Sequence, residues 1–195
     1  MTDRETWNLA VAAVAAEFAL LPPSRKALLA ELTESVKTCK KGLHAVAEGV
    51  SAGNICAACG GECCMTGKYH VTVVDLLVYL AGGAELFSPH FDQEHCPYLG
   101  EQGCLMAPAY RPFNCVTFNC ERVESRLEPA EQERLVLLEQ RIRALYGRFE
   151  ALFENRFMGG LLMNCERELV RDRTAILWGN GSLRHRTNPG SGGLS

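Results

Sequence analysis

The sequence predicts a mainly α fold, a helical bundle that carries an irregular cysteine-rich metal-binding insert. Two features lead to this prediction. Apolar residues recur at three- and four-residue steps in the first and last parts of the chain, which is the spacing of one helix face. Between these parts, residues 54–122 lack such a period and contain eight of the ten cysteines. Cysteines used only as small apolar residues have no reason to cluster, whereas thiolates that share a metal ion must do so.

Length and composition indicate a single domain over residues 1–195. A chain of 195 residues has an ordinary domain size. Its hydrophobic fraction of 47% is enough for a core that needs neither disulfides nor metal to fold. Within the domain we expect N-terminal helices at 1–50, a cysteine-cluster metal-binding region at 54–122, C-terminal helices at 128–178 and a flexible tail at 179–195.

Charge and hydropathy argue against nucleic-acid and membrane partners. The formal net charge of −3 gives no electrostatic footprint for nucleic acid, and no run approaches the roughly 20 apolar residues of a membrane span. Residues 9–16 (LAVAAVAA) resemble the apolar centre of a secretory signal, but Asp3 and Glu5 outweigh Arg4 before them, whereas a signal carries net positive charge there. We therefore expect a reducing, cytoplasmic location, where clustered cysteines more often bind metal than form disulfides.

The first 50 residues predict two amphipathic helices. Thr2-Asp3 offers a cap for the first, which should end before Pro22-Pro23. We expect Ser24 to cap the second, which ends between Gly49 and Asn54. The apolar stripe of the first helix is Trp7, Val11, Val14, Phe18 and Leu21. The second has an apolar face of Leu28, Leu29, Leu32, Val36, Cys39, Leu43 and Val46, with Cys39 in the core, and a polar side of Arg25, Lys26, Glu31, Glu34, Lys37, Lys40 and Lys41.

The centre of the chain is less regular. Residues 71–80 (VTVVDLLVYL) fit either a strand or a short buried helix; we favour a helix, capped by Thr72 or Asp75 and ended by Gly82-Gly83. Residues 84–120 have several Pro and Gly, little periodicity and four cysteines. Such a long structureless loop is unusual inside a domain, so we expect metal coordination to hold it.

Helical patterning returns at Glu128-Pro129, with Pro129 near the first turn. The stripe is Leu135, Leu138, Ile142, Leu145, Phe149, Leu152, Phe153 and Phe157. Gly159-Gly160 interrupts the pattern, and a last helix is predicted from about Leu161 to Trp178, with Cys165 on or near its apolar stripe.

The sharpest local motif is Cys56-Ala-Ala-Cys59-Gly60. Two residues between thiolates let both sulfurs reach one ion, and the glycine lets backbone N–H groups point at them. A thioredoxin-like redox pair would share the C-x-x-C spacing, but its βαβ surroundings are absent. A tetrathiolate zinc site carries a net charge of −2, which nearby cations would compensate; the candidates are Lys68, Arg111 and Arg122.

The side chains of the adjacent Cys63 and Cys64 are expected to diverge, so we expect them to serve two ions, or one to bind the metal and the other to pack beneath it. Eight thiolates divide into two closed four-sulfur sites or into one iron–sulfur cluster with spare cysteines. Four disulfides with two free thiols is the less favoured alternative. The predicted metal ligands are Cys56, Cys59, Cys63, Cys64, Cys96, Cys104, Cys115 and Cys120, and the predicted cofactor is zinc or iron, including an iron–sulfur cluster.

Histidines and acids near the cysteines are weaker candidates. His95, beside Cys96, could be a ligand, an outer partner of a ligand or a loop residue; His70 is less favoured. The remaining histidines, His44, His90 and His185, are expected at the surface, and the loop acids Asp92, Glu94 and Glu101 are expected to solvate the loop.

The order of these cysteines resembles the YkgJ-type cysteine-cluster (CxxCxxCC, zinc- or iron-chelating) family. The elements that match lie within about residues 54–122. They are Cys56-x2-Cys59-x3-Cys63-Cys64, Cys96-Pro97-Tyr98-Leu99, Cys104, Arg111-Pro112-x2-Cys115 and Cys120. Two departures are the three-residue spacing before Cys63 and Val116, where the family often has Arg. The resemblance implies metal chelation by these cysteines, often in an iron–sulfur cluster, and some relatives look like flagellin lysine methylases.

Three functions follow from these features. The favoured one is a metal-binding module on a helical scaffold, because no nucleophile–base set, phosphate-binding loop or paired carboxylates stand out. The alternative is an iron–sulfur-cluster enzyme in electron or group (methyl) transfer. The third is a zinc-stabilised interaction protein; a protein partner or a homo-oligomer remains open, since the helical stripes can be buried within one chain or between two.

Overall fold

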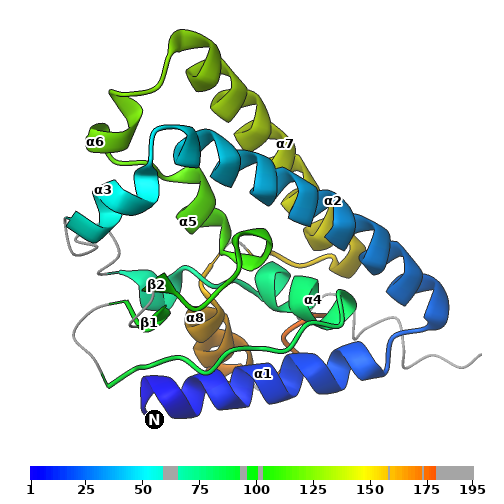
Figure 1. Ribbon diagram of the computed structural model, residues 1–195. Helices are drawn as coiled ribbons and strands as arrows, with labels where there is room; N and C mark the ends of the chain where they lie inside the picture. The colour runs from blue at the N-terminus through cyan, green and yellow to red at the C-terminus, as the bar shows by residue number, and fades with distance from the viewer. Residues whose placement is uncertain (59–65, 93–95, 101–102, 158, 173, 179–195) are drawn as a thin grey trace, which may run out of the picture.

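The computed structural model describes residues 1–58, 66–92, 96–100, 103–157, 159–172 and 174–178. The described part is mainly helical, as predicted. Figure 1 shows the long helices α2 (Pro23–Gly49) and α7 (Pro129–Phe153) side by side, with α1 (Asp3–Ala19) opposite them and α4 (Val73–Ala81) between. The expected tail at 179–195 lies outside the described residues.

Helix α1 follows its prediction closely. Thr2 accepts a hydrogen bond from the Glu5 backbone, and the Glu5 side chain accepts one from the Thr2 backbone, which forms a capping box. Trp7 and Val14 are buried, and Leu21 is buried just beyond the end of the helix. The two prolines that follow let the chain turn into α2.

Helix α2 differs from its prediction at two positions. Its cap is Pro22 and Pro23 is its first residue, so Ser24 is not the cap. A proline at the first position lacks an N–H and has the helical φ already, which removes one donor that a side-chain cap would satisfy. Lys40, predicted on the polar side, is fully buried with an exposed fraction of 0%. It lies four residues after Val36 and three before Leu43, on the buried face of the helix.

The ambiguous stretch at 71–80 forms a helix, α4, rather than a strand. Thr72 is its cap, in a capping box with Asp75, and Gly82 ends it. Gly83 has a φ of +62°, a conformation for which glycine is suited. Every residue from Val73 to Tyr79 is buried, because α4 packs against both α1 and α2.

The cysteine-rich region at about 54–122 is less irregular than expected. It contains α3 (Ala52–Ala58), the 3-10 turn η2 (Gly67–Tyr69), a hairpin of β1 (Leu99–Gly100) and β2 (Gly103–Cys104), the 3-10 turn η3 (Pro108–Tyr110), α5 (Phe113–Thr117) and α6 (Glu121–Glu124).

Apolar packing holds the described part of residues 84–120 against the core. The Trp7 ring centroid lies 5.7 Å from that of Phe87 and 6.0 Å from that of Tyr98, and Phe87 and Tyr98 are 5.4 Å apart. Tyr98 is 1% exposed. These aromatic side chains anchor the segment by hydrophobic burial, so metal coordination is not required to explain its position.

The C-terminal helices are shorter than predicted. Helix α7 ends at Phe153, because Glu154 adopts a left-handed conformation with a φ of 50°, so the buried Phe157 lies beyond the helix. Helix α8 (Leu161–Cys165) passes into a π-helical segment at Glu166–Arg171. Trp178 is therefore outside any helix. Among the described helices, none combines the length and apolar character needed to cross a bilayer.

Candidate metal centre

Five of the eight predicted ligands lie within the described residues. These are Cys56, Cys96, Cys104, Cys115 and Cys120; Cys59, Cys63 and Cys64 lie outside them, as does His95. Cys39 is confirmed in the core: it is 2% exposed, and its thiol donates to the Leu138 carbonyl at 3.2 Å. Cys165, predicted on or near an apolar stripe, is 0% exposed.

The β1–β2 hairpin brings Cys96 and Cys104 toward each other. Leu99 stands opposite Cys104 in the ladder, and the Leu99 amide donates to the Cys96 carbonyl at 3.0 Å. Burial raises the pKa of the Cys96 thiol, and negative charge on Cys104 raises it further. The hairpin thus carries one buried cysteine, Cys96, just before β1 and one exposed cysteine, Cys104, on β2.

The turn η2 lies against Cys96. A Cβ atom on Gly67 would come 2.6 Å from the Cys96 sulfur, which is closer than real side chains approach. The Tyr98 hydroxyl donates to the Lys68 carbonyl at 3.0 Å and holds the turn on the hairpin. Glycine is needed at position 67 because this contact leaves no room for a side chain.

The residue after η2, His70, contacts another predicted ligand. Its Nδ1 lies 3.3 Å from the Cys115 sulfur, and its Nε2 lies 3.2 Å from the Thr66 hydroxyl oxygen. Burial lowers the pKa of His70, although the Asp75 charge acts in the opposite direction. Cys115 is fixed by the short helix α5, whose Phe113 ring lies 5.3 Å from the Tyr146 ring. The sequence favours His95 over His70, because His95 adjoins Cys96. Nothing in the sequence indicates that His70 contacts Cys115, which lies far along the chain.

Cys56 and Cys120 lie on or directly before two short helices that contact each other. Cys56 is on α3 and Cys120 immediately precedes α6, and these helices contact each other. Figure 1 shows α3, α5, α6 and the hairpin gathered at one end, away from the loop that joins α1 and α2. Cys56 is exposed and Cys120 is half-buried.

A buried ionic network lies in the core, and the sequence did not predict it. The Lys40 ammonium donates to Asp75 Oδ1 at 2.8 Å, with exposed side-chain fractions of 0% and 1%. The Tyr146 hydroxyl donates to the same oxygen, while the Thr72 backbone and hydroxyl donate to Asp75 Oδ2 at 2.9 and 2.8 Å. Each buried charge is thus hydrogen-bonded, as buried charges require. The network joins α2, α4 and α7.

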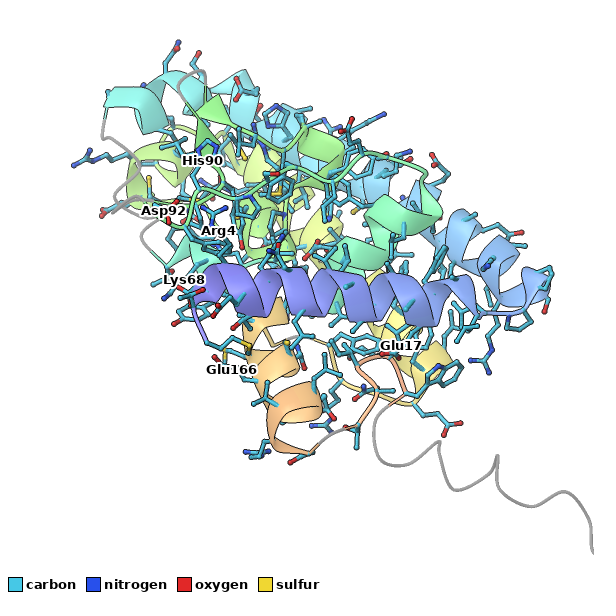
Figure 2. All side chains as sticks on the ribbon, turned by 90° about the horizontal axis from the view of Figure 1, so that it is seen from below. Arg4, Glu17, Lys68, His90, Asp92 and Glu166 are labelled. Carbon is cyan, nitrogen blue, oxygen red and sulfur yellow. The ribbon has the colours of Figure 1, made fainter. Side chains whose placement is uncertain are left out.

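Two of the three cations expected to compensate thiolate charge, Lys68 and Arg111, have other contacts. Lys68 pairs with Asp3 at 2.8 Å. Arg111 donates to the Met106 carbonyl at 3.4 Å, and its Nη1 lies 3.5 Å from His44 Nδ1. Figure 2 shows Lys68, Arg4 and Asp92 near the beginning of α1, where Arg4 and Asp92 pair at 2.6 Å.

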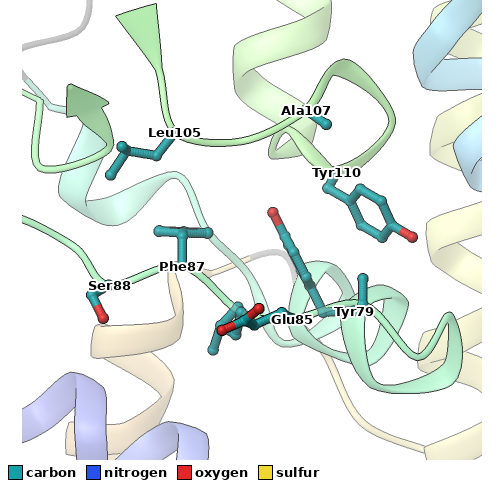
Figure 3. A pocket seen from close by; sticks show the side chains of 9 residues that line it. Tyr79, Glu85, Phe87, Ser88, Leu105, Ala107 and Tyr110 are labelled. Atoms are coloured by element: carbon teal, nitrogen blue, oxygen red, sulfur yellow. The ribbon is translucent and has the colours of Figure 1, made fainter. Parts of the chain in front are cut away.

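A pocket of about 450 Å³ adjoins the hairpin. Its wall includes Leu105, which directly follows Cys104, and two tyrosines, Tyr79 and Tyr110, whose ring centroids lie 4.6 Å apart. Figure 3 shows these rings with Phe87 and Glu85 around the opening. Burial is the main cause that raises the pKa of Tyr79, and negative charge on Cys104 adds to the rise. The pocket therefore lies near a predicted ligand.

Among the residues that the structure describes, no three His, Cys, Asp or Glu side chains converge as ligands of one metal ion would. Comparisons of the chain with models of protein families, with curated proteins and with solved structures return no match.

Proposed function

We propose that this protein binds zinc or iron through its clustered cysteines, with the helical scaffold holding the segments that carry them. The observation that supports this most strongly is the meeting of three distant segments. Cys96 lies against Gly67, Cys104 is on the strand that pairs with β1 shortly after Cys96, and Cys115 contacts His70.

Electrostatic effects on Tyr98 point the same way. Burial is the main cause that raises its pKa, and negative charge on Cys96 and Cys115 raises it further. Both thiols therefore lie near one buried hydroxyl, although they are 19 residues apart in the sequence. Thiols that gather in this way in a reducing, cytoplasmic environment are suited to metal binding. The order of the cysteine motifs supports assignment to the YkgJ-type family as part of the same proposal.

Metal analysis of the anaerobically purified full chain tests the proposal. We expect bound zinc, giving a colourless sample, or iron with acid-labile sulfide, giving a brown one. The same sample is titrated for free thiols without prior reduction. A protein with neither metal nor free thiols, before and after metal reconstitution, would show that the cysteines pair as disulfides and would overturn the proposal.

The second candidate is an iron–sulfur enzyme in electron or group transfer. The pocket beside Cys104 favours it, because a reaction at a cluster needs space for a substrate next to the sulfur ligands. Iron and sulfide in stoichiometric amounts, with a visible absorbance that bleaches on reduction, would support this candidate. Zinc alone would exclude it in favour of the binding module.

A further inference from the structure

The imidazole of His70 has a different partner on each side. Nδ1 faces the Cys115 sulfur at 3.3 Å and Nε2 faces the Thr66 hydroxyl at 3.2 Å. In the tautomer in which the threonine hydroxyl accepts the Nε2 proton, the Nδ1 lone pair is directed at the sulfur. Histidines that bind metals have this arrangement: one nitrogen coordinates, and the other donates to a partner that fixes the tautomer and the ring orientation.

The separation of Nδ1 and sulfur also fits two ligands of one ion. Zinc–nitrogen and zinc–sulfur distances of about 2.0–2.1 and 2.3 Å, at a tetrahedral angle, put the two donor atoms about 3.5 Å apart. The observed 3.3 Å lies a few tenths of an ångström from this value.

The sulfur of a second cysteine, Cys96, lies against the same turn. Its Sγ atom lies against Gly67, three residues before His70. The turn from Thr66 to His70 thus contacts two predicted sulfur ligands, and it follows directly after the Cys63-Cys64 motif in the sequence.

We propose that His70 binds the metal of the cysteine cluster through Nδ1, next to Cys115, with Thr66 as the outer partner that positions the ring. The inference rests on the metal-binding function proposed above and adds a nitrogen ligand to it. Zinc with three thiolates and one neutral imidazole carries a net charge of −1, rather than the −2 of a tetrathiolate site. The lower charge fits a site in which Lys68, one of the three candidate cations, already pairs with Asp3. A mixed sulfur–nitrogen ligand set favours a zinc-type divalent ion over an all-thiolate iron–sulfur cluster.

X-ray absorption spectroscopy at the zinc edge tests the ligand set in the reduced, zinc-loaded full chain. We expect sulfur neighbours at about 2.3 Å together with a nitrogen neighbour at about 2.0–2.1 Å. His70→Cys should keep the zinc and lose the nitrogen signal, because a thiolate takes the place of the imidazole. His70→Ala should weaken zinc binding at least about tenfold.

The matched control is His90→Ala. His90 is an exposed histidine whose backbone amide, rather than its ring, donates to the Pro97 carbonyl at 2.7 Å. This variant should bind zinc with the affinity and the nitrogen signal of the wild type.

The possible results separate this inference from the proposed function. Zinc bound by sulfur alone in the wild type, or a nitrogen signal that persists in His70→Cys, would overturn the role of His70 and leave metal binding intact. Failure of the wild type to bind any metal would overturn both. If His70→Ala does not fold, the wild-type spectrum and His70→Cys still decide the question.

Discussion

At the scale of single residues, Lys40 shows how a charged side chain can belong to the core. Its position on α2 matches the buried stripe, yet its chemistry suggested the solvent side. The burial of Lys40 depends on Asp75, 35 residues later, which accepts a hydrogen bond from Lys40 in the buried network. Removing one partner of a buried ion pair leaves an uncompensated charge.

We therefore predict that Lys40→Met lowers the free energy of unfolding by about 3–5 kcal/mol. Lys41→Met, at the exposed neighbouring position, should change it by less than about 0.5 kcal/mol. Urea denaturation followed by circular dichroism measures both. Similar midpoints for the two variants would mean that the buried pair contributes little to stability.

The cysteines divide at the same scale into predicted ligands and core residues. Cys59→Ser should remove most of the bound metal, because it breaks the C-x-x-C motif. Cys39→Ser should leave the metal content unchanged, since Cys39 lies in the core and donates to the Leu138 carbonyl. Metal content per chain, measured by elemental analysis, compares them. An equal loss from both variants would refute the predicted ligand set.

At the scale of elements, the turn η2 connects the fold to the candidate site. Gly67→Ala should push the turn away from the Cys96 sulfur, lowering the free energy of unfolding by about 1–3 kcal/mol and reducing the metal content. Gly147→Ala is the matched change on α7, where a Cβ atom meets nothing within 4 Å. It should raise stability by about 0.5–1 kcal/mol, because glycine is unfavourable inside a helix. Gly67→Ala with wild-type stability and metal content would argue against the tight contact.

The end of α1 holds the C-terminal segment through Glu17. Its carboxylate accepts from the Ile176 and Leu177 backbone amides at 2.9 Å each. Burial raises the pKa of Glu17 above its ordinary value of 4.5, although these hydrogen bonds act to lower it. The folded protein therefore binds this proton more tightly than the unfolded chain does.

The contribution of Glu17 to stability should be complete below pH 4.5 and should be lost as the pH rises through the folded-state pKa. Glu17→Gln does not titrate, so its stability relative to the wild type should increase between pH 4.5 and neutral pH. Denaturation curves of both proteins across this range measure the difference. A difference that stays constant or decreases would contradict the raised pKa.

At the scale of the whole molecule, most of the core lies outside the cysteine cluster. The helices α1, α2, α4 and α7 bury a shared set of apolar side chains that includes Trp7, Val36, Leu77 and Phe149. Hydrophobic burial of this kind is the main driving force of folding, so the scaffold does not depend on a metal ion as a zinc finger does.

Chelation of the proposed metal should accordingly leave most of the helical signal in far-ultraviolet circular dichroism. The thermal midpoint should fall, because a ligand that binds only the folded state stabilises it. Reloading with metal should restore the midpoint. Complete loss of helix on chelation would instead show that the metal organises the fold.

The sequence by itself determined the mainly helical class, the cap at Thr2, a second cap at either Thr72 or Asp75, and the core position of Cys39. These depend on local periodicity and on hydrogen bonds between residues close in the chain. Only the tertiary structure decided that Lys40 is buried, that α7 ends before Phe157, and that His70 faces Cys115. Each of these depends on a conformation or contact that short-range patterns do not contain: a partner 35 or more residues away for Lys40 and His70, and the left-handed turn at Glu154 for Phe157.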